Sequence, residues 1–266
     1  MDNNIITSVQ NSKIQKVRLL KQKKVRDELD VFLAEGDKLI EDAMSAGLEI
    51  LDVFVLDEKA DKFKDLINEA SDKNAFVSII NEKVLSSISQ TKSPQGIAAV
   101  IKKKASQYSD DILKCTRFAA ILENLQDPGN LGTIIRTCDA VGVDFIVMEN
   151  CTDIYNSKVI RASMGSIFNI PIYEIPLHQC IESMKSEQWQ VGCGHLHGEN
   201  FYLRKQKQKA AIIIGNESQG VSEPTSKLCT DLWKLPMKGK ADSLNASIAA
   251  GIMLYDIQNK FEDLVE

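Results

Sequence analysis

Hydrophobic and polar positions along the first part of the chain predict a small α/β unit. Short apolar runs typical of strands alternate there with segments whose apolar residues recur at helical spacing. The predicted strands are the start of VFLAEGDKLIEDAMSAG, then ILDVFVLD, AFVSII and GIAAVIK, and the helices between them are the rest of the first stretch, DKFKDLINEASDKN and NEKVLSSIS. Before them, from Lys13 to Arg26, apolar residues recur at near-helical spacing with basic residues between them, which predicts one amphipathic basic helix.

The second part of the chain shows a different pattern. Its apolar runs lack alternation, which is typical of strands in a mostly parallel sheet covered on both faces. These runs are RFAAILEN, DFIVME, IPIYEI, WQVGCG, AAIIIGN and LWKLP, with helical stretches between them. The polar stretch KKKASQYSDDILKCTR interrupts the apolar periodicity between the two parts. We therefore predict an α/β domain over 1–104, a linker over 105–117 and a second α/β domain over 118–266.

Three loops of the second domain follow predicted strands and carry polar side chains. They are NLQDPGNLGTIIR, GNESQGVS and PMKGKADSLNAS. Ligands of parallel sheets bind outside the carboxyl ends of the strands, so these loops are candidate binding loops. The first resembles a nucleotide-binding turn, but Gly129 and Gly132 fit neither the G-x-G-x-x-G nor the P-loop pattern. It therefore predicts another ligand, with Asn130 and the planar guanidinium of Arg136 as its polar contacts.

Composition limits the class of protein. The chain has 266 residues, 44% of them hydrophobic, which is ample for packed cores. No apolar run approaches the length of a membrane span, and MDNNIITSVQNSK lacks the basic flank and apolar centre of a signal peptide, so we expect a cytoplasmic protein. The 6 cysteines form no C-x-x-C pair, which is typical of reduced thiols, and we expect them to be small buried hydrophobic residues.

Charge is unevenly distributed. The formal net charge of −5 arises entirely after residue 104, because the preceding residues hold equal numbers of basic and acidic side chains. Seven basic residues lie between Lys13 and Arg26 without an acidic residue among them. A run of like charges is usually a solvated helix face, so composition alone favours solvent over RNA as the neighbour of this segment.

Each candidate loop also has a plain structural interpretation. GNESQG fits a simple turn, and in DSLNAS the side chain of Asp242 or Ser243 fits a cap for the following helix. Cys193, His195 and His197 alternate along one run, but no further ligand pair follows at zinc-like spacing, so we expect no metal. Trp189 and Trp233 open or lie within apparent strands and are expected to lie in the core rather than to stack on bases.

The combination of motifs is more specific than any one of them. In this order, DPGNLGTIIRT, IIIGNESQGVS and LPMKGKADSLNASIAAGIMLYD resemble the three signature motifs of the SpoU (TrmH) family of S-adenosylmethionine-dependent RNA ribose methyltransferases, within the SPOUT superfamily. The similarity spans 118–260. In the first part, FLAEGDKLIEDA and SPQGIAAV resemble the small α/β substrate-binding domain that precedes the catalytic domain in many ribosomal-RNA members.

The resemblance implies a fold and an assembly. The fold is an α/β domain with a mostly parallel sheet and a deep carboxyl-terminal trefoil knot, preceded by a small α/β RNA-binding domain. The knot would involve the loops 215–222 and 236–247. Family members bind the methyl donor in the knot, and the matching positions are Gly215, Leu235 and Leu244. Members are also homodimers that pack the first-motif helix and the carboxyl-terminal helix against the partner.

The implied reaction is methyl transfer from S-adenosylmethionine to a ribose 2'-hydroxyl, without a metal. Arg136 and Asn130 match the first-motif functional pair, Glu217 the second-motif acid, and Ser243 and Asn245 the third-motif polar residues. We interpret Arg136 as an electrostatic clamp on the RNA phosphate and on the developing alkoxide, because proteins do not normally deprotonate a guanidinium. In this interpretation Asn130 orients the guanidinium or the ribose, and Glu217 holds Asn245 or the arginine.

The resemblance also indicates the substrate. It favours RNA contact for the basic segment, with Lys13, Lys16 and Arg18 as candidates, and for Arg161 in RASMGSIF. The amino-terminal domain favours ribosomal RNA, of the large subunit, over the alternative of transfer RNA. A non-catalytic RNA-binding factor for ribosome assembly is a further alternative, which the intact motif residues oppose. In the second motif, Ser218 stands where many members have glycine.

Overall fold

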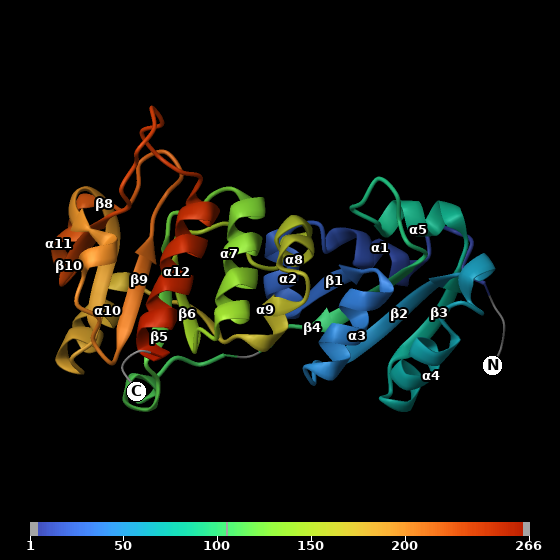
Figure 1. Ribbon diagram of the computed structural model, residues 1–266. Coiled ribbons are helices and arrows are strands. Elements are labelled where there is room, and N and C mark those ends of the chain that lie inside the picture. The colour runs from blue at the N-terminus through green and yellow to red at the C-terminus, as the bar shows by residue number, and fades with distance from the viewer. Residues whose placement is uncertain (1–4, 105, 263–266) are drawn as a thin grey trace. The chain divides into compact units, whose positions relative to one another are not determined.

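The computed structural model describes residues 5–104 and 106–262, which fall into two compact units (Figure 1). Of the described residues, the first unit contains 5–104 together with 155–161, and the second contains 106–154 and 162–262. Residue 105 of the expected linker and the outer ends of both expected domains lie outside the described residues. The rest of the linker segment includes the short helix α6 (Ile112–Cys115).

The first unit is built on a mixed four-stranded sheet in the order β1-β4-β2-β3, in which only β2 and β3 are parallel among the described strands. Its helices and strands confirm the predicted alternation except at the amino-terminal helix. The elements are α1 (Ser12–Leu19), α2 (Lys23–Leu29), β1 (Val31–Glu35), α3 (Asp37–Ser45), β2 (Ile50–Leu56), η1 (Asp57–Lys59), α4 (Lys64–Asp72), β3 (Phe76–Ile80), α5 (Glu82–Ile88) and β4 (Ile97–Lys102).

The prediction of a single helix from Lys13 to Arg26 is wrong. Helix α1 ends at Leu19 and α2 begins at Lys23, with Gln22 in an extended conformation between them. Arg26 folds back and donates from Nη1 to the carbonyl of Leu20 at 2.6 Å, which satisfies a carbonyl freed by the break. Apolar periodicity did not reveal the break because Leu20 is still buried, three residues after Val17.

The second unit contains a six-stranded sheet in the order β10-β8-β9-β5-β6-β7, and every strand pair described is parallel. This confirms the predicted parallel α/β class, and the central strands β5 and β9 are buried along their whole length. The path that would form a knot stays a prediction. The further elements are β5 (Phe118–Glu123), α7 (Pro128–Val141), β6 (Phe145–Glu149), α8 (Ser157–Ser163), α9 (Ser166–Asn169), β7 (Ile172–Glu174), α10 (Leu177–Ser186), β8 (Gln190–Asn200), η2 (Phe201–Leu203), β9 (Ala210–Ile214), α11 (Glu223–Leu228), β10 (Asp231–Lys234) and α12 (Ala246–Glu262).

Strand β8 is longer than the run WQVGCG predicted. It continues to Asn200 along β10, with a register shift between Leu232 and Trp233. Gly198 allows this close pairing, because a Cβ there would lie 2.7 Å from the backbone of Leu232. The polar sequence HLHGEN concealed the strand, because polar runs carry little of the apolar signal that identifies a buried strand.

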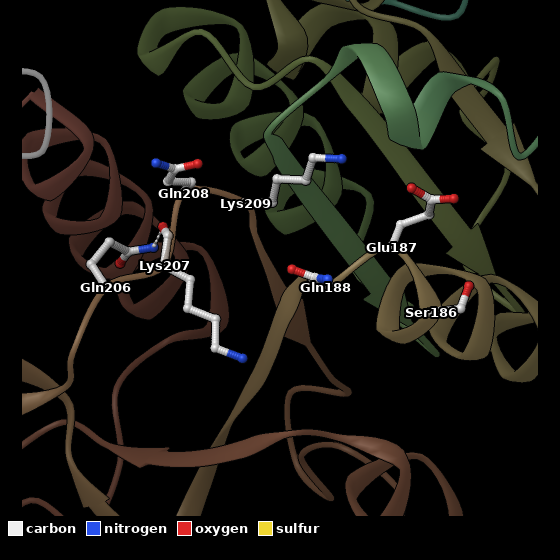
Figure 2. Close-up of a pocket in the computed structure, with 7 residues that line it drawn as sticks. All are labelled: Ser186, Glu187, Gln188, Gln206, Lys207, Gln208 and Lys209. Carbon is white, nitrogen blue, oxygen red and sulfur yellow. Dashed lines mark hydrogen bonds between the residues drawn. The ribbon is translucent and has the colours of Figure 1, made fainter.

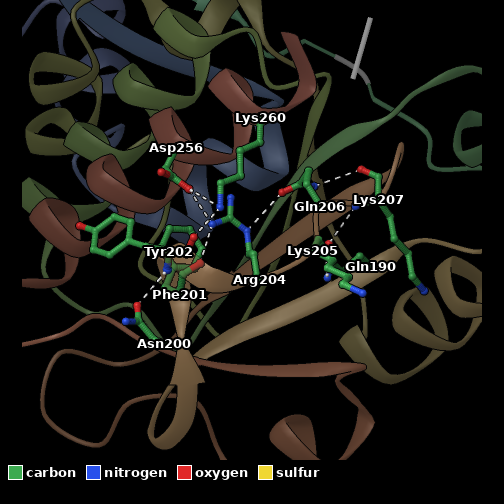
Figure 3. A network of polar contacts seen from close by, with 10 residues as sticks. All are labelled: Gln190, Asn200, Phe201, Tyr202, Arg204, Lys205, Gln206, Lys207, Asp256 and Lys260. Carbon is green, nitrogen blue, oxygen red and sulfur yellow. Dashed lines mark hydrogen bonds and ion pairs between the residues drawn. The ribbon is translucent and has the colours of Figure 1, made fainter. Parts of the chain in front are cut away.

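Helix α12 is anchored to the second unit by the buried side chain of Arg204 (Figure 3). The guanidinium lies 2.6 Å from Asp256 of α12 and donates to the carbonyl of Phe201 at 2.8 Å. It also stacks over the ring of Phe201, 3.8 Å from the ring centroid. This contact holds the carboxyl-terminal part of α12, and the amino-terminal end of the helix lies at the candidate site described below.

Side chains assigned to cores from sequence are mostly confirmed. Trp189 and Trp233 are each 1% exposed. All six cysteines are free, but only Cys138, Cys180 and Cys193 are buried. Cys151 and Cys229 are half-buried and Cys115 is exposed, so the expectation that every cysteine is buried is wrong at these three positions. In the described part of the chain, no helix combines the length and the apolar character needed to cross a membrane.

Candidate active site

The first candidate loop lies between β5 and α7. Asp127 is the N-cap of α7, and its side chain accepts the backbone N–H of Asn130 at 2.7 Å. Pro128 occupies the first turn, where its missing N–H costs no hydrogen bond. These local preferences start the helix directly after the loop and place Asn130 on its first turn.

Side chains from the three candidate loops meet at Asn130. Its amide nitrogen Nδ2 donates to Oε1 of Glu217 at 3.2 Å, and its Oδ1 accepts from Nδ2 of Asn245 at 3.0 Å. Glu217 therefore reaches Asn245 through Asn130, whereas our interpretation of the sequence was that it holds Asn245 or the arginine directly. The result is a chain of three polar side chains, one from each loop, at the carboxyl ends of the parallel strands.

Glu217 is held by backbone groups as well. Its carboxylate accepts the N–H of Asp127 at 3.1 Å and that of Gln126 at 3.4 Å. Partial burial raises the pKa of this carboxyl, but hydrogen bonds from its own backbone N–H and from Asn130, Asp127 and Gln126 outweigh burial, so the pKa is lowered overall. Glu217 is therefore a carboxylate at neutral pH and acts as an acceptor only.

Asn245 also caps helix α12. Its Oδ1 accepts from the backbone N–H of Ser247 at 2.9 Å and of Ile248 at 3.3 Å. The suggestion that Asp242 or Ser243 caps this helix is thus wrong, because the helix begins at Ala246, one residue after Asn245. This cap fixes the side chain of Asn245 through its oxygen, and its amide nitrogen Nδ2 donates to Asn130.

A cavity of about 400 Å³ lies beside this chain of side chains. Its lining includes Gly215, Leu235 and Leu244, the three positions expected to hold the methyl donor, together with Glu217 and Ser243. The lining combines apolar side chains with a small number of polar groups, as small-molecule sites do. The second- and third-motif loops thus enclose one cavity.

The loop after β9 is unusually tight. Asn216 and Gly220 exchange backbone hydrogen bonds of 3.0 and 2.9 Å, and Gly220 has a φ of +73°. A Cβ on Gly215 would lie 2.3 Å from the backbone of Gly220, so only glycine fits there. Ser218, which replaces a glycine of the family pattern, donates from its hydroxyl to Oδ1 of Asn216 at 2.9 Å and thereby strengthens the turn.

Arg136 lies two turns into α7 and is exposed. Among the residues that the structure describes, it has no hydrogen-bond or ion-pair partner. No hydrogen bond joins Asn130 to Arg136 among the described contacts, and the amide of Asn130 is instead bonded to Glu217 and Asn245. The guanidinium is therefore available for a ligand that reaches α7 from solvent.

The expected RNA contacts all belong to the first unit. Lys13 is paired with Asp52 at 2.5 Å, which neutralises much of its charge, while Lys16 and Arg18 are exposed on α1. Arg161 is on α8, in the short segment that is counted with the first unit.

Sequence reasoning missed a residue of the cavity. His195, which was weighed only as a metal ligand, lines the cavity from β8. Its ring centroid is 5.7 Å from that of His197, and no cluster of three metal-type ligands occurs in the described ranges. Its position just past the predicted end of a buried parallel strand is the signal that would have found it.

A second cavity, of about 540 Å³, lies near the amino-terminal ends of β8 and β9 in the same sheet (Figure 2). It is formed by the turn before β8 and the loop before β9, and its side chains are polar and spread apart. No candidate motif residue is in its lining, which consists of Ser186, Glu187, Gln188, Gln206, Lys207, Gln208 and Lys209. The cavity beside Asn130 is therefore the candidate active site.

Comparison with known proteins agrees with the motifs. Residues 117–255 match the SpoU rRNA Methylase family, and residues 11–99 match the MRM3-like substrate binding domain. The chain belongs to the SpoU rRNA methylase family. This confirms the resemblance seen in the sequence, including the substrate-binding domain that precedes the methylase domain.

The relatives match along almost the whole chain. The 23S rRNA (guanosine(2553)-2'-O)-methyltransferase RlmP of Bacillus subtilis (strain 168) is 32% identical over 95% of this chain and 98% of its own length. The structure of an AdoMet-bound rRNA methyltransferase from Sinorhizobium meliloti has 31% sequence identity and a TM-score of 0.86, covering 96% of this chain and 97% of that one. The SpoU methyltransferase AviRb from Streptomyces viridochromogenes, at 23% identity over 94% of this chain and 98% of its own and a TM-score of 0.81, shares the fold.

Proposed function

We propose that this SpoU-family protein transfers a methyl group from S-adenosylmethionine to a ribose 2'-hydroxyl of ribosomal RNA, in the 23S RNA of the large subunit. The observation that carries the proposal is the chain of hydrogen bonds Glu217–Asn130–Asn245, which joins the three signature loops beside one cavity. The relatives named above, which include a 23S rRNA 2'-O-methyltransferase, support the reaction and the substrate class.

The cavity suits the methyl donor. Its volume of about 400 Å³ falls within the roughly 300–1,000 Å³ typical of small-molecule sites. Leu235 and Leu244 offer apolar surface to an adenosyl group, and Gly215, which has no side chain, can present only backbone groups. When bound, the donor supplies an activated methyl group on a positively charged sulfur, so the protein needs to align the reactants and stabilise charge.

The residues on α7 and its neighbouring loops would perform the alignment. Asn130, held between Glu217 and Asn245, presents a fixed polar group to the ribose, and the hydroxyl of Ser243 in the cavity wall presents another polar group. Arg136 is free to bind a phosphate of the RNA and to stabilise the negative charge that develops on the ribose oxygen as it attacks the methyl carbon. The bond between the methyl carbon and sulfur breaks as the bond to the ribose oxygen forms, the hydroxyl proton passes to a base or to solvent, and S-adenosylhomocysteine leaves.

RNA binding would extend to the first unit. We propose domains over 1–104 and 118–266 joined by the segment 105–117, with the first domain as the RNA-binding part. Lys16 and Arg18 are its candidate phosphate contacts, and Lys13 contributes less because Asp52 pairs with it. Arg161 is a further candidate, from the segment 155–161 that is counted with the first unit. The match to a substrate-binding domain over residues 11–99 supports this role.

A homodimer is part of the proposal. Ile248, Ile252 and Tyr255 of α12 are 55%, 36% and 55% exposed and recur at helical spacing, so they form an apolar stripe on one face of the helix. A second copy of this chain is the proposed partner of that stripe. Sedimentation at several concentrations tests it, and Ile252→Asp should yield a monomer.

The proposal also includes the carboxyl-terminal trefoil knot formed by the loops 215–222 and 236–247. It further includes a cytoplasmic location, where ribosomal RNA is found.

We also propose that the reaction requires no metal ion. Methyl transfer in the presence of a strong chelator should therefore proceed at an unchanged rate.

The decisive experiment incubates the protein with methyl-labelled S-adenosylmethionine and, separately, unmodified large-subunit ribosomal RNA, assembled large subunits and transfer RNA. Each RNA is then digested to nucleosides. We expect a labelled 2'-O-methyl nucleoside from the ribosomal substrates and none with Arg136→Ala. Arg117→Ala is the matched control, because Arg117 is also exposed in the second unit but lies before β5, at the opposite edge of the sheet.

The outcomes separate the alternatives. Label recovered from transfer RNA alone would indicate that the substrate is transfer RNA and not ribosomal RNA. Donor binding without transfer to any RNA would contradict the proposed substrate. Failure to bind the donor, with RNA binding intact, would indicate a non-catalytic RNA-binding factor for ribosome assembly.

A further inference from the structure

A buried carboxylate that the motifs do not include lies at the end of the central strand β5. Glu123 is 5% exposed, although charged side chains are rarely buried unless paired. Its carboxylate accepts three hydrogen bonds, from the backbone N–H of Ser222 at 2.8 Å, the hydroxyl of Ser222 at 2.7 Å and the hydroxyl of Thr225 at 2.5 Å. All three donors are neutral and belong to one short segment, 99 to 102 residues later in the chain.

That segment ends the loop that lines the proposed donor cavity. The loop leaves β9 at Gly215 and enters α11 at Ser222, which is the N-cap of that helix. Ser222 is therefore the closing residue of the loop, and Glu123 binds both its backbone and its side chain. Movement of Glu123 would release the closing end of the loop.

Residues near Glu123 hold the other parts of the same loop. The carbonyl of Asn124 accepts from Nδ2 of Asn216 at 2.9 Å, at the start of the loop. The N–H groups of Gln126 and Asp127 bind Glu217 at its tip. The start and the tip are thus held at exposed or half-buried positions, whereas Glu123 supplies the one buried charged contact among the described contacts of this loop.

We propose that Glu123 is a positioning residue, which anchors the closing end of the loop 215–222 and thereby sets the affinity for S-adenosylmethionine. Glu123 does not line the cavity, so it acts through Ser222 and Thr225 rather than by contact with the donor. This inference rests on the proposed function for the identity of the ligand. The anchoring of the loop itself does not depend on that identity.

The test uses substitutions of similar shape on both sides of the contact. Glu123→Gln replaces one acceptor oxygen by a donor, and Thr225→Val removes one hydroxyl donor without changing size. Each should raise the Kd for S-adenosylmethionine, measured by calorimetry, about tenfold, as expected when a hydrogen bond to a charged group is lost. The double variant should bind no more weakly than Glu123→Gln, because both changes break the same anchor.

A matched control separates positioning from general stability. Asp144 accepts the backbone N–H groups of Arg117 and Phe118, both at 2.9 Å, at the other end of the same strand β5. Asp144→Asn should lower the melting temperature but leave the Kd for the donor unchanged. In steady-state assays with RNA, Glu123→Gln should raise the KM for the donor while kcat at saturating donor stays within about twofold of wild type.

Hydrogen exchange distinguishes failure of this inference from failure of the proposed function. In the absence of ligand, Glu123→Gln should accelerate exchange of the amides of Gly220 and Ser222, whereas Asp144→Asn should not. Unchanged exchange, or a Kd equal to that of wild type, would overturn the anchor, as would an equal loss of affinity in Asp144→Asn. If the wild-type protein binds no donor, the proposed function and the role in donor affinity both fail, and faster loop exchange would then support anchoring alone.

Discussion

The buried pair of Arg204 and Asp256 allows a quantitative prediction about stability. The side chain of Arg204 is 2% exposed and that of Asp256 is 26% exposed. Burial lowers the pKa of Arg204, against the opposing effect of the hydrogen bond and charge of Asp256. Asp256→Asn keeps the shape of the side chain but removes the negative charge that compensates the buried guanidinium.

The magnitude follows from what Arg204 retains. Removing one partner of a buried ion pair typically costs roughly 3–5 kcal/mol, because the other charge is left uncompensated. Here the guanidinium keeps the carbonyl of Phe201 and the stacking on its ring, and Asp256 is partly solvated. We therefore expect the lower end, a loss of about 3 kcal/mol in the free energy of unfolding of the second unit. For a unit of this size, that corresponds to about 6–12 °C in Tm.

Tryptophan fluorescence during urea unfolding provides the assay. The chain contains 2 tryptophans, Trp189 and Trp233, and both lie in the second unit, so the signal reports that unit alone. Lys260→Gln is the control, because Lys260 lies 3.8 Å from Asp256 and should contribute under about 1 kcal/mol.

A double substitution gives the refuting result. Arg204→Met combined with Asp256→Leu removes both charges and should cost less than Asp256→Asn alone, because no unpaired charge remains buried. Two results would show that a buried charge pair does not hold α12. One is a loss of stability in the double variant equal to the sum of the losses in Arg204→Met and Asp256→Leu measured separately, and the other is a loss under about 1 kcal/mol in Asp256→Asn.

Three further predictions follow from the site and the thiols. Gly215→Ala should abolish donor binding in calorimetry, because its Cβ would meet backbone at 2.3 Å, whereas Gly239→Ala, which has open space, should not. The pKa of Glu217 is lowered in the folded state, so its contribution to stability is present at neutral pH and is lost as pH falls through that lowered pKa. The Tm difference between wild type and Glu217→Gln should therefore narrow on acidification, and a constant difference would contradict this. A disulfide reagent at mildly alkaline pH should modify Cys115 first, because this thiol is exposed, whereas burial raises the pKa of Cys151 to about 11 and keeps its thiol protonated. A thiol that reacts equally fast in Cys115→Ser would contradict this prediction.

Local periodicity was enough to predict most elements, because the burial of strands and helices repeats along the sequence. It failed where a contact outside the local pattern intervened. Arg26 returns to the carbonyl of Leu20 and separates α1 from α2, although Leu20 continues the apolar spacing. Strand β8 extends through a polar stretch because Gly198 lets β10 approach.

The class of sheet, the three loops at the carboxyl ends of its strands and the family were all predictable from the sequence, since each depends on residue types at short spacing. The hydrogen bonds among the side chains of those loops were not predictable, because they form only when distant segments of the chain fold together. Asn130 is 87 residues from Glu217 and 115 from Asn245, and no local pattern specifies such pairs. Glu123 was hidden for the same reason, because its partners lie about a hundred residues away and a glutamate that ends an apolar strand gives no sign of burial.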